Sequence, residues 1–139
     1  MTAAIQRTAG LIDADGDVLY HETAGAGEPL VLCHGLGGNG GIWFHQVPAF
    51  ARHRRVVVWD QRGFGRSTDH RDSSVQRAVD DLERVLDHLG VDSCALVGQS
   101  MGGWAALGFA LRSPERVRAL VLSATTGGIV APGFDGARP

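Results

Sequence analysis

A serine between two glycines is the strongest chemical signal in the sequence. Ser100 is the central residue of Gly98-Gln-Ser-Met-Gly102, which directly follows an apolar, strand-like run and directly precedes a helical stretch. A sharp turn from strand to helix strains its central residue and requires small residues two positions away on each side. Such a turn lifts the hydroxyl above the carboxyl edge of a sheet, beside the free N–H groups of a helix start. The pattern therefore predicts Ser100 as a catalytic nucleophile, with Gly98 and Gly102 giving the turn its room.

A second glycine-rich segment, His34-Gly-Leu-Gly-Gly38, follows an earlier strand-like run. Glycines at such a point allow a backbone N–H to turn toward the nucleophile. Acyl transfer requires two N–H donors on the developing oxyanion, and the loss of one typically costs about 3–4 kcal/mol of transition-state stabilisation. We predict that these donors are the backbone N–H groups of Leu36 and Met101, with Gly37 as the alternative to Leu36.

His34 is a candidate general base in its own right, because imidazole is the commonest one. Its place at the end of a strand favours a different role, in which its ring braces the loop through hydrogen bonds. We therefore assign His34, Gly35 and Gly37 to a loop that supports the oxyanion donors, and we do not assign His34 as the base.

A third segment, Asp60-Gln-Arg-Gly-Phe-Gly-Arg-Ser67, carries no arrangement of nucleophile and base. Its two glycines indicate a tight loop. An ion pair of Asp60 with Arg62 or Arg66 would fix that loop, so we expect a structural role for the segment.

An alternative function comes from the same residues. Gly35-Leu-Gly-Gly-Asn-Gly40 has the form G-x-G-x-x-G after a strand, and Asp60 ends the next strand twenty residues later. This spacing is typical of a Rossmann-type, NAD-binding domain with an acidic residue on the ribose. Against it, a hairpin precedes the strand, and the glycines around Ser100 are left without a role.

The composition restricts the other function classes. The chain has 139 residues, the size of one domain, with 44% apolar and 20% charged residues and a net charge of −2. All 13 basic residues are Arg. The absence of Lys excludes a phosphate-binding loop ending in Gly-Lys and a Schiff-base lysine. The nearly balanced charge predicts no nucleic-acid partner.

Cysteine, histidine and apolar patterns set further expectations. Cys33 and Cys94 lie inside apolar runs and form no CxxC pair, which is typical of free, buried thiols in a reducing compartment. The six His show no metal-ligand spacing, so we expect neither a metal nor a cofactor. No segment has the length of a signal peptide core or a membrane span. We expect a cytoplasmic protein without a membrane partner.

The elements that must position these motifs follow an α/β pattern. Nearly continuous apolar runs are typical of parallel strands that are covered on both faces. We predict such strands at residues 29–33, 55–60, 94–97 and 117–123. Helical patterns lie between them, at residues 42–50, at 73–89 with a capping box of Ser73 and Gln76 and a stop at Gly90, and at 101–112.

An antiparallel hairpin is predicted ahead of these elements, formed by residues 5–12 and 18–21 around a turn-rich loop. The order predicts an α/β fold with an N-terminal hairpin and a mostly parallel sheet. We place one partial domain at residues 1–126, followed by a Gly/Pro-rich loop or tail at 127–139.

Taken together, the three motifs resemble the N-terminal half of an α/β-hydrolase-fold serine hydrolase. The likeness covers residues 11–126 and is to the group of enol-lactonases, non-haem haloperoxidases, carbon–carbon bond hydrolases and proline iminopeptidases. It implies the first six strands of that fold, with Ser100 after the fifth. It also implies a small-molecule acyl substrate, whether ester, lactone, thioester, amide or vinylogous C–C compound. Haloalkane dehalogenases and epoxide hydrolases carry Asp at this position, so Ser100 argues against a close likeness to them.

The resemblance leaves the catalytic triad incomplete. In this fold the order along the chain is Ser, acid, His, but every His here precedes Ser100, the latest being His88. The acidic residues after Ser100 are Glu115, in the turn before the last strand, and Asp135, in the Gly-rich tail. We therefore expect a truncated chain with little or no activity alone. A non-catalytic pseudo-hydrolase, or one half of a split enzyme, is the alternative.

The last predicted strand, residues 117–123, would form an exposed edge of the sheet. Exposed edges pair readily with other chains. We expect self-association through this edge, or pairing with a missing C-terminal half.

Overall fold

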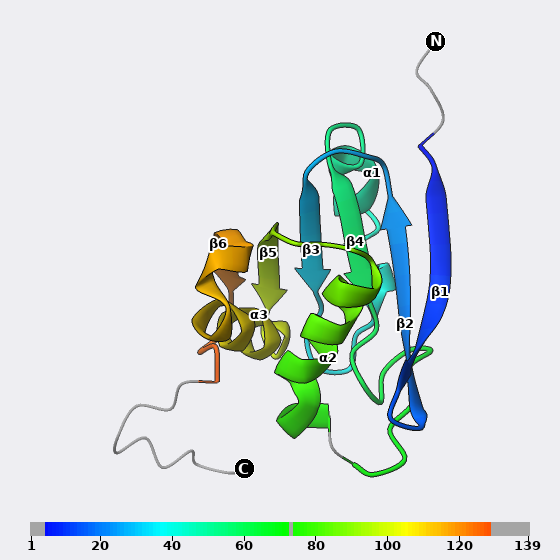
Figure 1. Cartoon of the computed structure of the whole chain (residues 1–139), viewed down its shortest axis with the longest axis vertical. Coiled ribbons are helices and arrows are strands. Elements are labelled where there is room, and N and C mark those ends of the chain that lie inside the picture. Colours follow the sequence, from blue (N-terminus) through cyan, green and yellow to red (C-terminus); the bar gives the residue numbers. More distant parts are fainter. Residues whose placement is uncertain (1–4, 73, 129–139) are drawn as a thin grey trace.

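A computed structural model describes residues 5–72 and 74–128, and it contains one six-stranded sheet in the order β1-β2-β4-β3-β5-β6 (Figure 1). The strands are β1 (Arg7–Ala14), β2 (Asp17–Ala24), β3 (Pro29–Cys33), β4 (Arg55–Trp59), β5 (Cys94–Gln99) and β6 (Val117–Ser123). The helices are α1 (Gln46–Phe50), α2 (Ser74–His88) and α3 (Gly102–Arg112), with short 3₁₀ turns η1 (Gly40–Trp43) and η2 (Pro114–Arg116).

The sheet combines a hairpin with a parallel part. β1 and β2 pair antiparallel through the whole hairpin, and β2 pairs antiparallel with β4. The pairs β3–β4, β3–β5 and β5–β6 are parallel. The predicted α/β fold with an N-terminal hairpin and a mostly parallel sheet is therefore confirmed.

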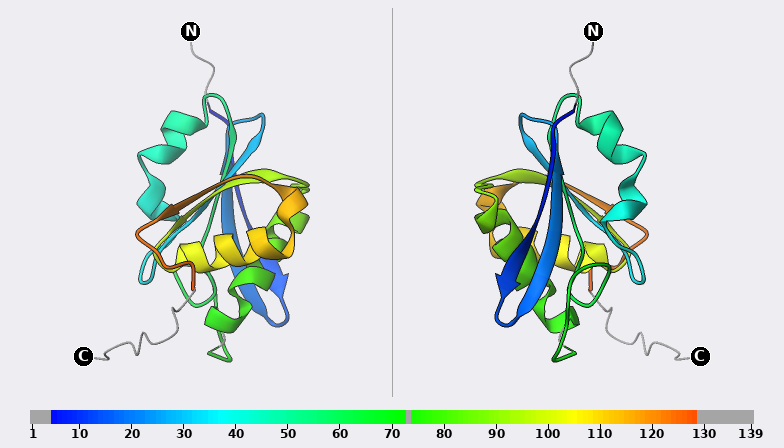
Figure 2. Two further views of the ribbon diagram at one scale, coloured as in Figure 1. Left: turned by 90° about the vertical axis from the view of Figure 1, so that its left-hand side faces the viewer. Right: turned by 90° about the vertical axis from the view of Figure 1, so that its right-hand side faces the viewer.

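Helices cover the two faces of the sheet unequally. On one face α2 and α3 bury Val31, Val57 and Leu96, and on the other face α1 packs with Leu32 and Val58. Figure 2 shows α1 on the side opposite to α2 and α3. Successive residues of β3 and β4 thus enter different cores. This explains why the central strands are apolar without alternation.

The strand order reverses direction between β3 and β5. After β3 the chain passes through α1 to β4 on one side, and after β4 it crosses through α2 to β5 on the other side. The carboxyl ends of β3 and β5 remain adjacent, since Cys33 pairs with Gly98. The loops that follow these two strands leave in opposite directions. Open α/β sheets bind ligands at such topological switch points.

Several boundaries differ from the predicted ones. The predicted helix at 42–50 is divided into η1 and the five-residue α1, which contains Pro48 in its first turn. Proline lacks the N–H that a longer helix needs, and the two glycines of η1 favour no regular helix. The strands 29–33 and 117–123 are as predicted, whereas β4 ends at Trp59 and β5 extends to Gln99. Gly90, at φ +64°, follows the end of α2 as predicted. The capping box at Ser73 lies outside the described residues.

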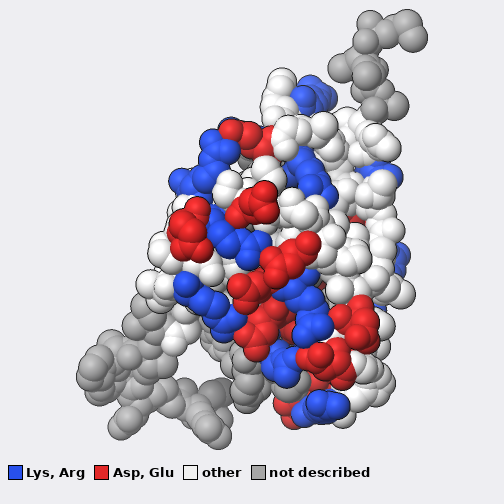
Figure 3. All heavy atoms as spheres, viewed as in Figure 1, with Lys and Arg blue, Asp and Glu red and all other residues white. Residues whose placement is uncertain are grey.

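The outer surface of α2 and α3 is rich in ion pairs. Arg112 contacts Asp80 and Glu83, and Arg116 contacts Asp87. Figure 3 shows acidic and basic side chains interleaved on this side of the molecule. Within residues 5–72 and 74–128, every helix is too short or too polar to cross a membrane.

Candidate active site

Ser100 lies in a strained turn between β5 and α3. Its φ of +51° is in the left-handed region, which residues with a side chain rarely adopt. The Ser100 N–H donates to the carbonyl of Ser123 at the end of β6, at 2.9 Å, and the Ser100 carbonyl accepts from Gly103 N at 2.9 Å. A conformation of this kind costs on the order of 1–3 kcal/mol and persists only when its surroundings hold it.

The flanking glycines allow three backbone segments to meet at this turn. A Cβ on Gly98 would lie 2.6 Å from Gly103 Cα, and a Cβ on Gly102 would lie 2.1 Å from the carbonyl oxygen of Cys33. Both distances are far below van der Waals contact. β3, β5 and the start of α3 therefore approach as closely as they do because these positions carry no side chain.

A pocket of about 340 Å³ opens beside Ser100 and contains both predicted donor residues. Its walls are formed by Leu36, Met101, Trp104, Ala124, Thr125 and Thr126. Among the hydrogen bonds between described residues, none uses the backbone N–H of Leu36 or of Met101. The N–H groups of Leu36 and Met101 therefore remain available to a ligand.

The direction of the Leu36 N–H is set by the peptide group to which it belongs. The carbonyl of that peptide, on Gly35, accepts from His34 Nδ1 at 2.7 Å and from Gly38 N at 3.1 Å. Because a trans peptide is planar, its N–H points away from its C=O. Gly35 also lies against the strained turn, since a Cβ there would be 3.1 Å from Ser100 Cβ.

The His34 ring is fully buried and both of its nitrogens are engaged. Nε2 lies 2.9 Å from the backbone N of Gln61, which can only donate, so Nε2 accepts and Nδ1 carries the proton given to Gly35. The Gln61 side-chain amide donates to the carbonyl of His34. These two bonds require a neutral ring, and burial favours that form by lowering the pKa of His34. His34 cannot take a proton from Ser100 without losing one of these bonds.

The predicted ion pair of Asp60 with Arg62 or Arg66 is wrong. The Asp60 carboxylate accepts backbone N–H groups, from Gly40 at 2.7 Å and from Arg66 at 2.8 Å. It thereby ties the loop after β3 to the loop after β4 through main-chain contacts. Each of its two oxygens accepts one of these N–H groups.

Arg62 turns instead toward the hairpin and α2, where it is buried. It donates to both oxygens of Asp81, at 2.8 and 2.7 Å, and to Asp17 at 2.7 Å. Burial alone would raise the pKa of Asp17, but hydrogen bonds from His70 and Thr68 outweigh it and lower that pKa to about 2. The roles of Arg62 and Gln61 have no signal in the local sequence, because their partners lie far away along the chain.

No base or acid adjoins Ser100 among the described residues, since none of the His, Asp or Glu side chains there lines the Ser100 pocket. Glu115 lies in η2, at the opposite end of β6 from Ser123. Asp135 lies outside the described residues. In the described part of the chain, no three His, Cys, Asp or Glu side chains gather where a metal ion could be held.

The profile of the α/β hydrolase fold matches residues 28–137, most of the chain. The chain belongs to the α/β-hydrolase family. It is 42% identical over 109 residues to a 2-hydroxymuconate semialdehyde hydrolase of a Pseudomonas species, covering 75% of this chain and 38% of that protein.

Solved structures of this family share the backbone. An enzyme described as degrading N-acyl homoserine lactones, Est816, is 37% identical with a TM-score of 0.77, over 84% of this chain and 45% of that one. The epoxide hydrolase CorEH is 29% identical with a TM-score of 0.84, over 92% of this chain and 46% of that one. The chain thus spans less than half the length of these relatives.

These comparisons correct one expectation. The NAD-binding alternative is wrong, since the chain belongs to the hydrolase family and the Asp60 carboxylate is engaged by main-chain N–H groups.

Proposed function

We propose that this chain is the nucleophile-bearing part of a serine hydrolase that acts on an ester-like or related acyl substrate. One observation carries the proposal: Ser100, at φ +51°, shares its pocket with the residues of two unengaged N–H donors, Leu36 and Met101. The 37% identity to an enzyme named for the degradation of a lactone, which is an ester-like acyl compound, supports this substrate class.

The mechanism is nucleophilic acyl transfer. The Ser100 oxygen attacks the carbonyl carbon, and the carbonyl oxygen gains negative charge as the tetrahedral intermediate forms. The N–H groups of Leu36 and Met101 stabilise this charge, each by about 3–4 kcal/mol. Met101 precedes the first turn of α3, so the positive end of the helix dipole acts on the same oxygen.

The proton of Ser100 needs a base that these residues do not provide. His34 is engaged on both nitrogens, and no His follows Ser100 in the sequence. In this proposal the acid and the base come from the part of the fold that lies beyond the matched region. A polypeptide of these 139 residues alone then retains only the effect of the oxyanion donors, roughly 10³–10⁴ over water.

Fluorophosphonate labelling of the 139-residue polypeptide tests the proposal. We expect slow labelling that maps to Ser100, together with very weak hydrolysis of p-nitrophenyl acetate. Ser100→Ala abolishes both, whereas the control Ser93→Ala, at the amino end of β5, leaves them unchanged. Labelling that survives Ser100→Ala contradicts the assignment of the nucleophile. Rapid, stoichiometric labelling of Ser100 contradicts the absence of a base.

A non-catalytic pseudo-hydrolase is the second candidate, favoured by the absence of His, Asp and Glu from the described lining of the pocket. It predicts binding of a phosphonate ester, detected as a thermal shift, with no covalent adduct at any time. A covalent adduct on Ser100 decides against it.

A further inference from the structure

The strand β1 lies at one edge of the sheet, and its outer side pairs with no other strand among the described residues. The right-hand view of Figure 2 shows β1 in front, with no described helix between it and the viewer. An edge strand presents a row of unpaired N–H and C=O groups, which readily pair with another chain. The chain that β1 can accept depends on which groups point outward and on the side chains beside them.

The pairing inside the sheet fixes which β1 residues point outward. Gly25 N donates to the carbonyl of Gln6 at 3.0 Å, so the backbone of Gln6 faces β2. On the other side of β2, Asp60 N donates to the carbonyl of Tyr20, so the even-numbered residues of β2 face β4. Hydrogen-bonded positions alternate along antiparallel pairs. The backbone groups of four β1 residues therefore point away from the sheet: Arg7, Ala9, Leu11 and Asp13.

The side chains of these four residues share one face of the sheet, because side chains alternate along a strand. All four residues are exposed, and Leu11 is exposed to 60%. Arg7 lies at one end of the row and Asp13 at the other, with Ala9 and Leu11 between them. The row thus has a cation at one end, an anion at the other end and an apolar middle.

Such a row is complementary to a second copy of itself that runs in the antiparallel direction. When Gly10 lies opposite Gly10 of the second copy, Arg7 lies opposite Asp13 and Ala9 lies opposite Leu11. The outward backbone groups then meet in hydrogen-bonded pairs, and opposite charges across two strands stabilise the register. A shift by two residues places Arg7 opposite Leu11, or Asp13 opposite Ala9, so the charges select one register.

The charged groups of the row retain hydrogen-bonding capacity for this pairing. Arg7 lies 3.8 Å from Glu22, a long ion pair, and its side chain is 61% exposed. The Asp13 carboxylate accepts a backbone N–H from Gly16 at 3.4 Å. Arg84 donates to the Asp13 carbonyl at 3.3 Å, and a carbonyl oxygen has two lone pairs. A second copy can therefore pair with β1 without breaking these contacts.

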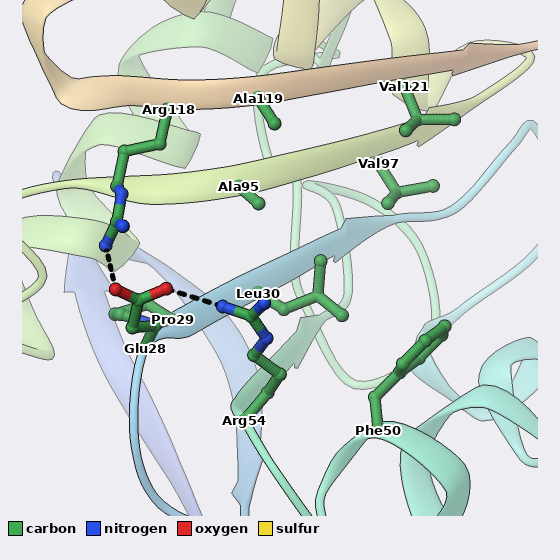
Figure 4. Close-up of a pocket in the computed structure, with 10 residues that line it drawn as sticks. All are labelled: Glu28, Pro29, Leu30, Phe50, Arg54, Ala95, Val97, Arg118, Ala119 and Val121. Carbon is green, nitrogen blue, oxygen red and sulfur yellow. Dashed lines mark hydrogen bonds and ion pairs between the residues drawn. The ribbon is translucent and has the colours of Figure 1, made fainter.

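The opposite edge of the sheet, β6, lacks this complementarity. Arg118 is the one charged residue of Val117–Ser123, and it lies 2.6 Å from Glu28 (Figure 4). A hollow of about 450 Å³ lies beside this ion pair, over Ala95 and Ala119. β6 therefore carries no pair of opposite charges that could set a register between two copies.

We propose that β1 is the interface of a symmetric dimer, in which two copies of this chain join their sheets by antiparallel pairing of residues 7–13. The two-fold axis passes between the two Gly10 residues. Each copy contributes the same strand, so the interface closes with two copies. Two ion pairs of Arg7 with Asp13 flank an apolar centre formed by Ala9 and Leu11. The interface does not involve Ser100, so it is independent of the proposed function.

Disulfide trapping tests the register. Ala9→Cys and Leu11→Cys are made separately in the 139-residue chain, and each is oxidised in air with copper–phenanthroline, alone and as an equal mixture. Directly opposite residues lie within the Cα separation that a disulfide needs. We expect the mixture to give about fivefold more cross-linked dimer than either variant alone. The native thiols provide little background, because burial raises the pKa of Cys33 to about 12 and that of Cys94 to about 11.

The other outcomes of the trapping contradict the proposal. Efficient cross-linking of Ala9→Cys alone, or of Leu11→Cys alone, means that this residue lies opposite itself, in a different register. Equal yields in all three samples indicate random collisions. A cross-link between Ala9→Cys and Leu122→Cys, an exposed position on β6, means that β1 pairs with the β6 edge of a neighbouring copy.

Charge reversal provides a second test, by sedimentation equilibrium. Arg7→Glu and Asp13→Arg each place like charges opposite one another, and each is expected to raise the dimer dissociation constant about tenfold. The double variant restores opposite charges and should return the constant to within about threefold of wild type. The control Arg52→Glu changes an exposed arginine in the turn after α1 and should have no effect.

Urea denaturation of the same variants confirms that each is folded. A wild-type chain that stays monomeric at every concentration overturns the proposal, and it would leave β1 to an extended segment of another protein. A double variant that dimerises no better than the single variants also overturns it, because the pairing of Arg7 with Asp13 then sets no register.

Discussion

The Nδ1 of His34 donates a 2.7 Å hydrogen bond to the carbonyl of Gly35, and this contact sets the direction of the next N–H, that of Leu36. A rotation of the Gly35–Leu36 peptide would break this hydrogen bond and redirect the Leu36 N–H. Gly37, at φ +73°, gives the loop the freedom for such a rotation. The buried imidazole, held in turn by Gln61, removes that freedom.

Replacing His34 is therefore expected to destabilise the protein. His34→Ala leaves the backbone N–H of Gln61 buried without an acceptor and opens a cavity, which together cost about 2–4 kcal/mol of unfolding free energy. Urea denaturation measures the loss. The control His53→Ala changes an exposed histidine and should stay within about 0.5 kcal/mol of wild type. A His34→Ala protein as stable as wild type would mean that other contacts hold the loop.

Ser100 offers a test of backbone strain. Ser100→Gly removes the Cβ that makes φ +51° costly, at the expense of a more flexible unfolded chain. We expect a net stabilisation of about 1 kcal/mol, whereas Ser100→Ala, which keeps the Cβ, is neutral within about 0.5 kcal/mol. Equal stability of the two variants in urea would show that the turn stores no strain.

Substitutions at Gly102 and Gly90 distinguish two reasons for a glycine: close contact with other backbone atoms at Gly102, and a positive φ at Gly90. Gly102→Ala places a Cβ against the carbonyl oxygen of Cys33, where two strands and a helix leave no room to move. We expect a loss of about 3 kcal/mol or more, or failure to fold. Gly90 has φ +64° but no atom within 4 Å of an added Cβ, so Gly90→Ala should cost only about 1–2 kcal/mol. Thermal denaturation compares the two, and similar losses would contradict this account.

His21 should make stability depend on pH. His21 is 5% exposed, neither of its ring nitrogens has a hydrogen-bond partner among the described residues, and its ring centroid lies 5.5 Å from that of His88. Burial, followed by the charges of His88 and Arg55, lowers the pKa of His21 below the ordinary 6.5. The unfolded chain thus takes up a proton that the folded chain refuses, so stability falls as the pH drops below about 6.5.

Denaturant melts between pH 7 and pH 5 measure this dependence. Over the pH range in which only the unfolded chain binds this proton, the free energy of unfolding falls by at most about 1.4 kcal/mol per pH unit. His21→Leu should flatten the curve by that amount, and His53→Leu should not. An unchanged slope in His21→Leu would place the dependence elsewhere.

Strands and turns could be predicted from the sequence, whereas contacts between residues far apart along the chain could not. Pro29–Cys33 and Val117–Ser123 were predicted to the residue, because turn residues bound compact apolar runs. The glycines around Ser100 indicated a tight turn for the same reason. The partners of Asp60 and Arg62 were predicted wrongly, because proximity in sequence suggested an ion pair between them. Arg62 instead contacts carboxylates 45 and 19 positions away, and Gln61 contacts His34 across 27 positions. Only the tertiary fold brings these groups together.

The buried guanidinium of Arg62 also constrains the order of assembly. Its ion pairs with Asp17 and Asp81 join the turn end of the hairpin, the loop after β4 and the helix α2 at one buried position. Losing its hydration shell is unfavourable until both carboxylates are in place. The hairpin and α2 therefore gain most by closing onto the loop in a single concerted event. Through this one buried ion-pair cluster, we expect the hairpin, the loop after β4 and α2 to fold as one cooperative unit.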